Sequence, residues 1–366
     1  MDFSRYDLVN KQGGFFTLIL EKFEMPFFLK IDYDNIYNLD EIIKENKNSK
    51  RKAILVTDKT IDKLYGEVVC EQLKNIFKKV EKKIIDNNLL NSSFDLALFV
   101  INNDYNVIIG LGGGKVLDVS KYAAFISKKE FISIPTAIAH DGIASPIAVL
   151  KCDNSVKSLG CRVPSGIIID LRVISQAPIN LIKAGIGDTL SNLIAIKDWK
   201  LAHKRGKEKI NDFALLLSET AVNAVLNYGD KNIKNIGFLH QVAESLVLSG
   251  LAMNIAGSSR PCSGSEHLIS HSMDRLNKGN LHGIQVAVSS IISSYLYNDD
   301  YKQVINFLNI FEIPTTLKEL NISHDEYIDI MLNAKSTRPN RYTILDEIDI
   351  SKNNLEKIYK DLFQKK

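Results

Sequence analysis

The chain has 366 residues, of which 45% are apolar and 24% are charged, and its formal net charge at pH 7 is +3. This composition excludes wholesale disorder, and the mixing of Lys and Arg with Asp and Glu argues against a nucleic-acid-binding surface. A chain of this length exceeds one ordinary hydrophobic core, so we expect two domains.

The first half of the chain alternates short apolar runs with segments of helical periodicity. Such alternation is typical of a parallel, helix-covered sheet of the Rossmann-like kind. The strands are predicted at 53–57, 82–85, 106–111, 131–134 and 167–170, and the helices at 61–77, 94–101 and 116–126.

The pattern changes after residue 135. Two apolar runs, 147–151 and 156–162, flank a short polar turn and predict a β-hairpin. From about Pro178 onward nearly every segment carries a helical apolar period, so this part is predicted to be all-helical. The clearest helical segments are 213–226, 240–255 and 284–297.

These patterns place a domain boundary near residues 171–178. We predict an α/β domain at 1–175 and an all-helical domain at 176–366, with a ligand cleft between them. We find no signal-peptide core, and no apolar run that approaches the about 18–20 residues of a membrane span. The four cysteines lack Cys-x-x-Cys spacing, which fits a reducing cytoplasm. We therefore expect a soluble, cytoplasmic protein.

Three consecutive glycines, Gly112, Gly113 and Gly114, lie between a predicted strand and a predicted helix. They let the backbone approach a ligand closely, and the N–H groups that begin the helix can bind a pyrophosphate. The usual dinucleotide fingerprint fails because its third glycine falls on Lys115, and a P-loop fails because Val116 follows that lysine. The alternatives are an anion-binding turn and a tight turn without a ligand.

Two further features follow predicted strands. Asp58 follows the strand at 53–57, where an acidic residue either accepts hydrogen bonds from an adenosine ribose or caps the next helix. The segment 135–146 is rich in small and hydroxyl residues and contains the pair His140 and Asp141. Loops at the carboxyl ends of parallel strands bind ligands, and the alternative here is a proline-bounded connection.

Three histidines lie close together in the sequence. His267 and His271, four residues apart, would project from nearly the same face of a helix, and His282 follows a helix-breaking segment. Asp188 begins an apolar helical run upstream and offers a carboxylate. One carboxylate and two imidazoles suit a divalent metal ion that acts as a Lewis acid. For any one histidine, an ordinary hydrogen-bonded side chain is the alternative.

Six blocks of residues follow one another between about residue 50 and residue 346. The blocks are Gly112-Gly113-Gly114-x-x-x-Asp118-x-x-Lys121, Pro135-Thr136-Ala137-x-Ala139-His140-Asp141-Gly142-x-Ala144-Ser145-Pro146, Gly187-Asp188, Ser258-Ser259-Arg260-Pro261-x-Ser263-Gly264-Ser265-Glu266-His267-x-x-x-His271, His282-Gly283, and Arg338-Pro339-Asn340-Arg341-Tyr342-Thr343-Ile344-Leu345. Together they resemble the sn-glycerol-1-phosphate dehydrogenase family. The glycine turn is shared with the wider superfamily of glycerol dehydrogenase, iron-type alcohol dehydrogenases and dehydroquinate synthase.

The resemblance implies a dehydroquinate synthase-like fold, with a nucleotide-binding α/β domain and an all-helical domain that binds metal and substrate. It implies NAD or NADP, one divalent ion (zinc, nickel or iron), a small phosphorylated polyol or ketone as substrate, and a homo-oligomer. The implied metal ligands are Asp188, His267 and His282, and the implied catalytic or substrate-binding residues are Asp188, Asp141 and His271. In addition to Asp58 from the strand pattern, the cofactor-binding residues are Gly112, Gly113, Gly114, Lys115, Val116, Thr136, Ala137, Ile138, Ala139 and Ser145.

The expected reaction is the reversible reduction of dihydroxyacetone phosphate by NADH or NADPH to sn-glycerol 1-phosphate. His271 is the candidate for relaying the proton, with water as the alternative, and Arg260 could neutralise the substrate phosphate. Asp58 favours NAD because a carboxylate repels a 2′-phosphate, although Lys59 could compensate. The alternatives are a dehydrogenase of glycerol or another alcohol, a dehydroquinate synthase-like lyase, and a nucleotide-binding protein without catalysis.

Overall fold

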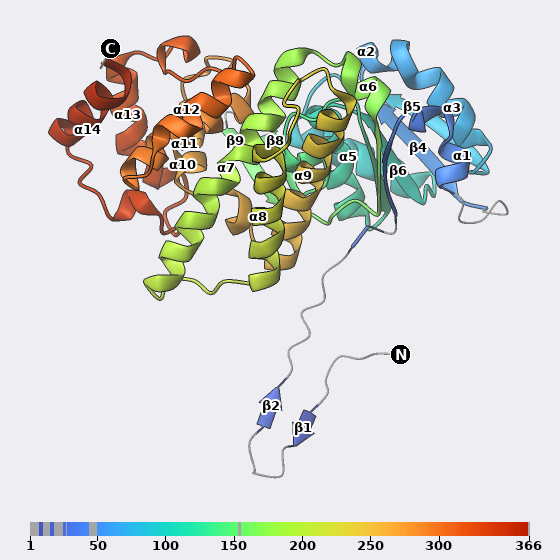
Figure 1. The fold of residues 1–366 in the computed structure, drawn as a ribbon. Coiled ribbons are helices and arrows are strands. Elements are labelled where there is room, and N and C mark those ends of the chain that lie inside the picture. The colour runs from blue at the N-terminus through green and yellow to red at the C-terminus, as the bar shows by residue number, and fades with distance from the viewer. Residues whose placement is uncertain are drawn as a thin grey trace.

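The protein has an α/β half followed by an all-helical half, which confirms the predicted fold class (Figure 1). The computed structural model describes residues 7–9, 15–17, 25–26, 28–43, 50–152 and 155–364. Strands β1 (Asp7–Val9) and β2 (Phe15–Thr17) form an antiparallel pair of their own. Most other elements of the first half build a larger sheet and its covering helices, and two further strands form a hairpin.

This larger sheet has six strands, and every adjacent pair is parallel. The strands are β3 (Phe28–Asp32), β4 (Lys52–Thr57), β5 (Lys79–Ile84), β6 (Val107–Gly112), β7 (Glu130–Pro135) and β10 (Gly166–Asp170). Their order is β3-β10-β7-β6-β4-β5, so the first strand of the sheet pairs with its last. The sequence predicts five of these strands and misses β3.

Helices cover both faces of the sheet, which explains the continuous apolar runs in its strands. They are η1 (Asn35–Tyr37), α1 (Leu39–Ile42), α2 (Lys59–Ile61), η2 (Asp62–Gly66), α3 (Glu67–Lys74), α4 (Leu90–Asn102), α5 (Gly114–Ser127), η3 (Asp141–Ile143) and α6 (Leu171–Gln176). Along β4, Ala53 and Leu55 belong to one core with α3, whereas Ile54 and Val56 belong to a larger core with α4 and α5. The helix predicted at 61–77 is divided among α2, η2 and α3.

The predicted hairpin is also confirmed. β8 (Ile147–Cys152) pairs antiparallel with β9 (Ser155–Gly160), and Ala148 and Leu150 of β8 belong to the larger core. Residues 153 and 154 of its turn lie outside the described residues.

The second half is arranged around α7 (Ile179–Lys204), a helix of 26 residues. Asp188 lies in the middle of α7, so the prediction that it begins a helical run is wrong. Gly185 and Gly187 lie within this helix, and both positions face neighbouring backbone and have no room for a larger side chain. The other helices are α8 (Asp212–Leu226), α9 (Ile236–Ala256), η4 (Arg260–Cys262), α10 (Ser265–Asp274), α11 (His282–Leu296), α12 (Tyr301–Ile310), η5 (Lys318–Leu320), α13 (His324–Ala334), η6 (Lys335–Thr337), η7 (Ile344–Asp346), α14 (Lys352–Tyr359) and η8 (Lys360–Gln364).

Among the described residues, α9 is long and apolar enough to cross a membrane by length and composition alone. This contradicts the expectation that no apolar run approaches that length. However, 67% of its apolar window is buried inside the protein, where Val242 and Leu246 pack in the larger core. Such burial is typical of a core helix in a soluble protein.

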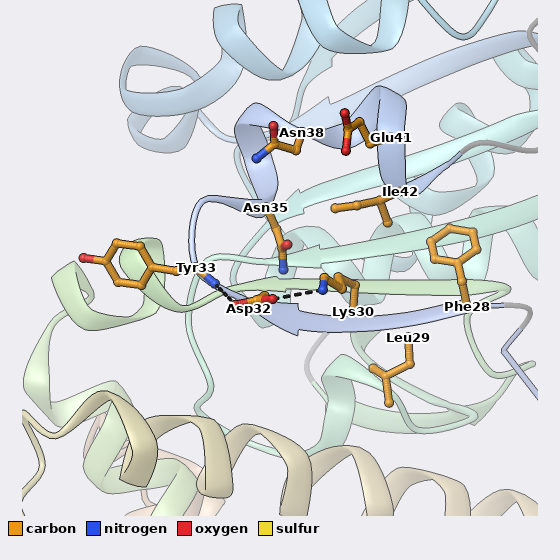
Figure 2. A pocket seen from close by; sticks show the side chains of 9 residues that line it. All are labelled: Phe28, Leu29, Lys30, Asp32, Tyr33, Asn35, Asn38, Glu41 and Ile42. Carbon is orange, nitrogen blue, oxygen red and sulfur yellow. Dashed lines mark hydrogen bonds and ion pairs between the residues drawn. The ribbon is translucent and has the colours of Figure 1, made fainter.

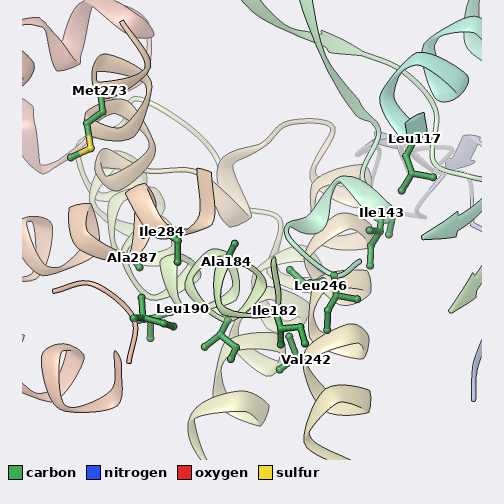
Figure 3. Packing of buried hydrophobic residues seen from close by; sticks show 14 of the residues in the cluster. Leu117, Ile143, Ile182, Ala184, Leu190, Val242, Leu246, Met273, Ile284 and Ala287 are labelled. Atoms are coloured by element: carbon green, nitrogen blue, oxygen red, sulfur yellow. The ribbon is translucent and has the colours of Figure 1, made fainter. Parts of the chain in front are cut away.

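A single hydrophobic core spans the two halves (Figure 3). Leu117 of α5 and Ile143 of η3 belong to the same cluster as Ile182 of α7 and Leu246 of α9. This shared core runs across the predicted boundary between residues 175 and 176. The division into two domains therefore stays a prediction.

Two glycines allow the halves to approach this closely. A Cβ atom at Gly185 of α7 would lie 1.9 Å from the carbonyl oxygen of Ile138, and one at Gly250 of α9 would lie 2.7 Å from the backbone nitrogen of Ser145. Because both contacts are to backbone, a larger side chain could not be accommodated by a rotamer change. The segment after β7 is thereby held directly against α7 and α9.

Candidate active site

Three side chains of metal-binding type converge where α7, α10 and α11 meet. Asp188, His267 and His282 offer ligand atoms that all lie within 4.8 Å of one another. The Nε2 atom of His282 lies 3.8 Å from Oδ1 of Asp188. The structure thus brings together the three residues that the sequence proposes as metal ligands, and their donor set suits a divalent transition metal ion.

Glycines bring α7 and α11 together at this point. A Cβ atom at Gly187 would lie 2.3 Å from the carbonyl oxygen of Gly283, and one at Gly283 would lie 1.9 Å from the carbonyl oxygen of Ala184. Each glycine is the neighbour of a cluster residue, Asp188 on α7 and His282 on α11. The close helix crossing is what places the carboxylate beside the imidazole.

Hydrogen bonds fix the orientation of both imidazoles. The hydroxyl of Ser270 donates to Oε1 of Gln285 at 3.0 Å and accepts from Nδ1 of His282 at 3.3 Å. Similarly, Oε1 of Glu266 accepts from Nδ1 of His267 at 2.7 Å. Both rings therefore carry their proton on Nδ1 and present Nε2 as a lone-pair donor, as metal-binding histidines commonly do.

Burial sets the charge state of the cluster. It lowers the pKa of His267 and of His282 well below the usual value, so both rings are neutral and able to donate a lone pair. Burial, followed by the nearby Asp141, raises the pKa of Asp188 well above its usual value. A divalent cation at this position would oppose that rise by favouring the carboxylate. The two neutral imidazoles thus fit such an ion, and the ion would in turn keep the Asp188 carboxylate ionised.

Replacing Ser270 with alanine should weaken metal binding about 10- to 100-fold, because His282 loses the partner that orients it. Metal affinity measured by competition with a chromophoric chelator would report the change. Ser272→Ala is the matched control, since Ser272 is buried on the same helix and its hydroxyl has no hydrogen-bond partner in the described structure. Equal affinities for the two variants would contradict an orienting role for Ser270.

The glycine turn lies at the carboxyl edge of the sheet, between β6 and α5. The position beside Gly113 is open, because a Cβ there would meet no atom within 4 Å. The first N–H groups of α5 lack intrahelical partners, as at any helix start, and can bind an anion. Asp58 follows the adjacent strand β4 and accepts from the N–H groups of Thr60 and Ile61, so the helix-cap interpretation of this residue is confirmed.

The segment after β7 joins the glycine turn to the metal cluster. Its residue His140 lies against Gly114, where a Cβ atom would be 2.5 Å from Nε2 of His140. The next residue, Asp141, donates its backbone N–H to Oδ2 of Asp188 at 2.9 Å. Burial raises the pKa of Asp141 to about 6. A ligand that spans the glycine turn and the cluster would therefore run along this segment.

A buried lysine on α5 holds this segment in place. The Nζ atom of Lys121 donates to the carbonyl oxygens of Gly142 at 2.6 Å and Ile147 at 2.7 Å, and it lies 3.8 Å from Oδ1 of Asp118. Burial raises the pKa of Asp118 to about 7, although Lys121 opposes the rise. The sequence gives no role to either residue, because their partners lie in a separate segment.

Replacing Lys121 with methionine should destabilise the protein by about 3–5 kcal/mol, because Asp118 would keep its burial and lose its cation. Because the pKa of Asp118 is already about 7 in the wild type, Asp118 is protonated in both folded proteins below that pH, and above it only the wild type ionises. The deficit should therefore widen as the pH rises above about 7. Urea unfolding at several pH values would measure this. The exposed Lys115 lies on the same helix, and Lys115→Met should leave the unfolding free energy unchanged.

Comparison with known proteins places the chain in a family. Residues 30–178 match the family described as iron-containing alcohol dehydrogenase. The chain is 36% identical over 332 residues to the glycerol-1-phosphate dehydrogenase of Methanobrevibacter smithii, covering 90% of this chain and 94% of that one. It is 38% identical over 311 residues to the protein of the same name from Staphylothermus marinus, covering 84% and 88%. This chain belongs to the glycerol-1-phosphate dehydrogenase family.

Solved structures support the fold of this family member. A probable glycerol dehydrogenase from Sinorhizobium meliloti superposes with a TM-score of 0.76 at 18% identity, covering 93% of this chain and 97% of that one. Glycerol dehydrogenase from Schizosaccharomyces pombe gives a TM-score of 0.74 at 19% identity, covering 94% and 93%. At such low identity, these structures establish the shared architecture alone.

The third histidine of the sequence cluster, His271, lies beside the metal-binding residues. Its ring is 5.9 Å from the ring of His282 and 6.0 Å from that of His267, measured between centroids. Its side chain is 25% exposed, and Nδ1 lies 3.6 Å from Oδ2 of Asp274. His271 therefore lies next to the metal-binding residues and is also in contact with solvent.

The suggestion that Arg260 neutralises a substrate phosphate is wrong. Arg260 is only 2% exposed, and its Nε and Nη2 atoms donate to the Glu208 carboxylate at 2.5 and 2.8 Å. Its Nη1 atom donates to the carbonyl oxygen of Tyr342 at 2.8 Å. Because a bidentate carboxylate already neutralises this guanidinium, it serves as a structural tie between distant segments.

A surface hollow lies at the outer edge of the sheet, beside β3 (Figure 2). Lys30 forms an ion pair there with Asp32, at 2.9 Å. The hollow contains none of the residues proposed for the cofactor, the metal or the substrate. Its lining residues are Phe28, Leu29, Lys30, Asp32, Tyr33, Asn35, Asn38, Glu41 and Ile42.

Proposed function

We propose that this protein catalyses the reversible reduction of dihydroxyacetone phosphate by NADH or NADPH to sn-glycerol 1-phosphate. The observation that carries the proposal is the cluster of Asp188, His267 and His282, joined through Asp141 to a glycine turn of nucleotide-binding type. The names of the similar glycerol-1-phosphate dehydrogenases support the same reaction and the NAD(P) cofactor.

In this proposal Asp188, His267 and His282 hold one divalent ion, which is zinc, nickel or iron. When bound, such an ion supplies Lewis-acid stabilisation of negative charge on the substrate oxygen. The hydrogen bonds from His267 to Glu266 and from His282 to Ser270 keep both Nε2 atoms available to it.

The proposed cofactor site follows the carboxyl edge of the sheet. The turn Gly112, Gly113, Gly114, Lys115 and Val116 would hold the pyrophosphate, and Thr136, Ala137, Ile138, Ala139 and Ser145 would line the nicotinamide. When bound there, the nicotinamide would supply hydride for the carbonyl carbon. Asp58, whose Oδ1 caps α2, would bind the adenosine ribose through Oδ2, which favours NAD. Lys59 forms an exposed ion pair with Asp86 at 3.2 Å.

The chain's own residues would then bind the ketone and deliver a proton. Asp141 and His271 would hold the substrate beside Asp188. As hydride adds to the carbonyl carbon, the oxygen must gain a proton, and His271 would relay it because it contacts both solvent and the cluster. Water is the alternative donor.

The test is to add dihydroxyacetone phosphate with NADH, and separately NADPH, to metal-replete protein and to follow the absorbance of the reduced nicotinamide. A chelator-treated sample runs beside it. Metal-dependent loss of absorbance that yields the 1-phosphate enantiomer is expected. No loss with either nucleotide, across zinc, nickel and iron, would contradict the assignment.

A dehydrogenase of glycerol or another alcohol is the second candidate, because the fold is shared with glycerol dehydrogenases. Faster turnover of free glycerol than of the phosphate ester would favour it. A dehydroquinate synthase-like lyase would leave the nucleotide unchanged at the end of the reaction. We further propose that the protein is cytoplasmic and forms a homo-oligomer.

A further inference from the structure

Two arginines near the C-terminal end of the fold have an unusual environment. Arg338 follows η6 and donates through Nη1 to the Ser259 hydroxyl at 2.9 Å. Arg341 donates through Nη2 to the same hydroxyl at 2.8 Å, and through Nη1 to the carbonyl oxygen of Ser263. One serine oxygen thus holds both half-buried guanidinium groups side by side.

Neither guanidinium forms an ion pair with a carboxylate among the described residues, in contrast to other arginines of the chain. Arg172 pairs with Asp34 at 2.5 Å, Arg205 with Glu347 at 2.6 Å, and Arg260 with Glu208 at 2.5 Å. A half-buried pair of like charges without a direct counter-ion is unfavourable, and an anionic ligand would relieve that cost.

The electrostatics of Arg338 and Arg341 agree with this geometry. Burial lowers the pKa of Arg338. It lowers the pKa of Arg341 to about 9, with further contributions from Arg338 and Arg260. Glu208 and Glu266 oppose that decrease only from beyond ion-pair distance. Burial and the neighbouring arginines therefore disfavour the charged form of Arg341.

These two arginines lie beside the metal cluster. Ser263, whose carbonyl accepts from Arg341, immediately precedes the Gly264 cap of α10, which carries His267 in its first turn. Thr337, the residue before Arg338, donates its hydroxyl to the carbonyl oxygen of Leu268, the neighbour of His267 in α10, at 3.5 Å. A small molecule with its ketone oxygen at the cluster could thus extend an anionic end toward the arginines.

We propose that Arg338 and Arg341 form the subsite that binds the phosphate group of the substrate. Two guanidinium forks match the oxygens of a phosphate dianion, which provides both charge and directed acceptors. This inference rests on the proposed function, since it names the part of the site that selects a phosphorylated ketone over a free one. Arg260 supports the subsite indirectly, because its bond to the Tyr342 carbonyl anchors the segment that carries Arg341.

The test compares the wild type with Arg338→Gln and Arg341→Gln for dihydroxyacetone phosphate and for unphosphorylated dihydroxyacetone. Each substitution should lower kcat/KM for the phosphate ester about 10- to 100-fold, because it removes a charged hydrogen bond. Turnover of the free ketone should stay within about twofold. Arg341→Lys should recover part of the loss, because it keeps the charge and loses the fork. Arg172→Gln is the matched control, since its ion pair with Asp34 lies at the sheet edge.

Titration calorimetry with inorganic phosphate gives a second readout that is independent of turnover. The wild type should bind phosphate more tightly than Arg338→Gln, a variant that keeps the bond from Arg341 to Ser263 and hence the local fold. Equal phosphate affinity, together with an unchanged preference between the two ketones, would overturn the subsite. The wild type could turn over neither ketone while the variants bind phosphate more weakly than it does. In that case the anion site would stand and the proposed reaction would be wrong.

Discussion

Replacing His267 with alanine should lower kcat/KM for dihydroxyacetone phosphate about 10³-fold and prevent stoichiometric binding of a divalent metal ion. The variant keeps one imidazole and one carboxylate, too few to hold the ion firmly, and loses its Lewis-acid contribution of several kcal/mol. Elemental analysis of the purified protein, together with steady-state kinetics, would measure both effects.

The matched control for this variant is His240→Ala. His240 lies on α9, its side chain is 43% exposed, and its Nδ1 atom is 4.0 Å from Glu244. This substitution should change neither metal content nor turnover. If His267→Ala kept a full complement of metal and near-normal activity, the metal centre would have to lie elsewhere and the proposed site would be wrong.

Replacing Gly283 with alanine should cost about 3 kcal/mol of unfolding free energy, because one added methyl group overlaps the backbone of the facing helix. The new Cβ would lie 1.9 Å from the carbonyl oxygen of Ala184, so α11 must move away from α7. The same displacement separates His282 from Asp188, and metal affinity should fall together with stability. Urea unfolding and metal titration of one preparation would test both.

Gly229→Ala is the control for this effect. A Cβ at Gly229 would meet no atom within 4 Å, and its φ lies outside the left-handed range. The substitution should be neutral or stabilise the protein by up to about 1 kcal/mol, because it restricts the unfolded chain. Equal stability of the two variants would show that the α7–α11 crossing is not limited by its glycines.

The sequence could predict features that depend on local pattern. The alternation of apolar runs and helices predicts most of the parallel sheet, and the spacing of His267 and His271 places both on one helix. The family resemblance implied the three metal ligands, and the structure brings them together. Strand β3 escaped prediction because it is a partly exposed edge strand whose partner β10 lies far along the chain.

Contacts between distant segments explain the remaining differences. No pattern around Arg260 reveals that Glu208, 52 residues earlier, neutralises it, which is why its proposed phosphate role was wrong. Ser270 lies on a different helix from Gln285 and His282. The hydrogen bonds that join Ser270 to both residues therefore could not be predicted from the sequence. The close packing at Gly185 and Gly187 likewise depends on the backbone of other segments.

The pairing of β3 with β10 also has a consequence for the order in which the chain folds. The two strands are tied further by a bond from the Ile36 N–H to Asp170, which spans 134 residues. During synthesis, the first strand of the sheet must therefore wait until the last has left the ribosome. Because such distant contacts form late and slow folding, we expect β3 to be the last strand to gain protection in pulsed hydrogen exchange.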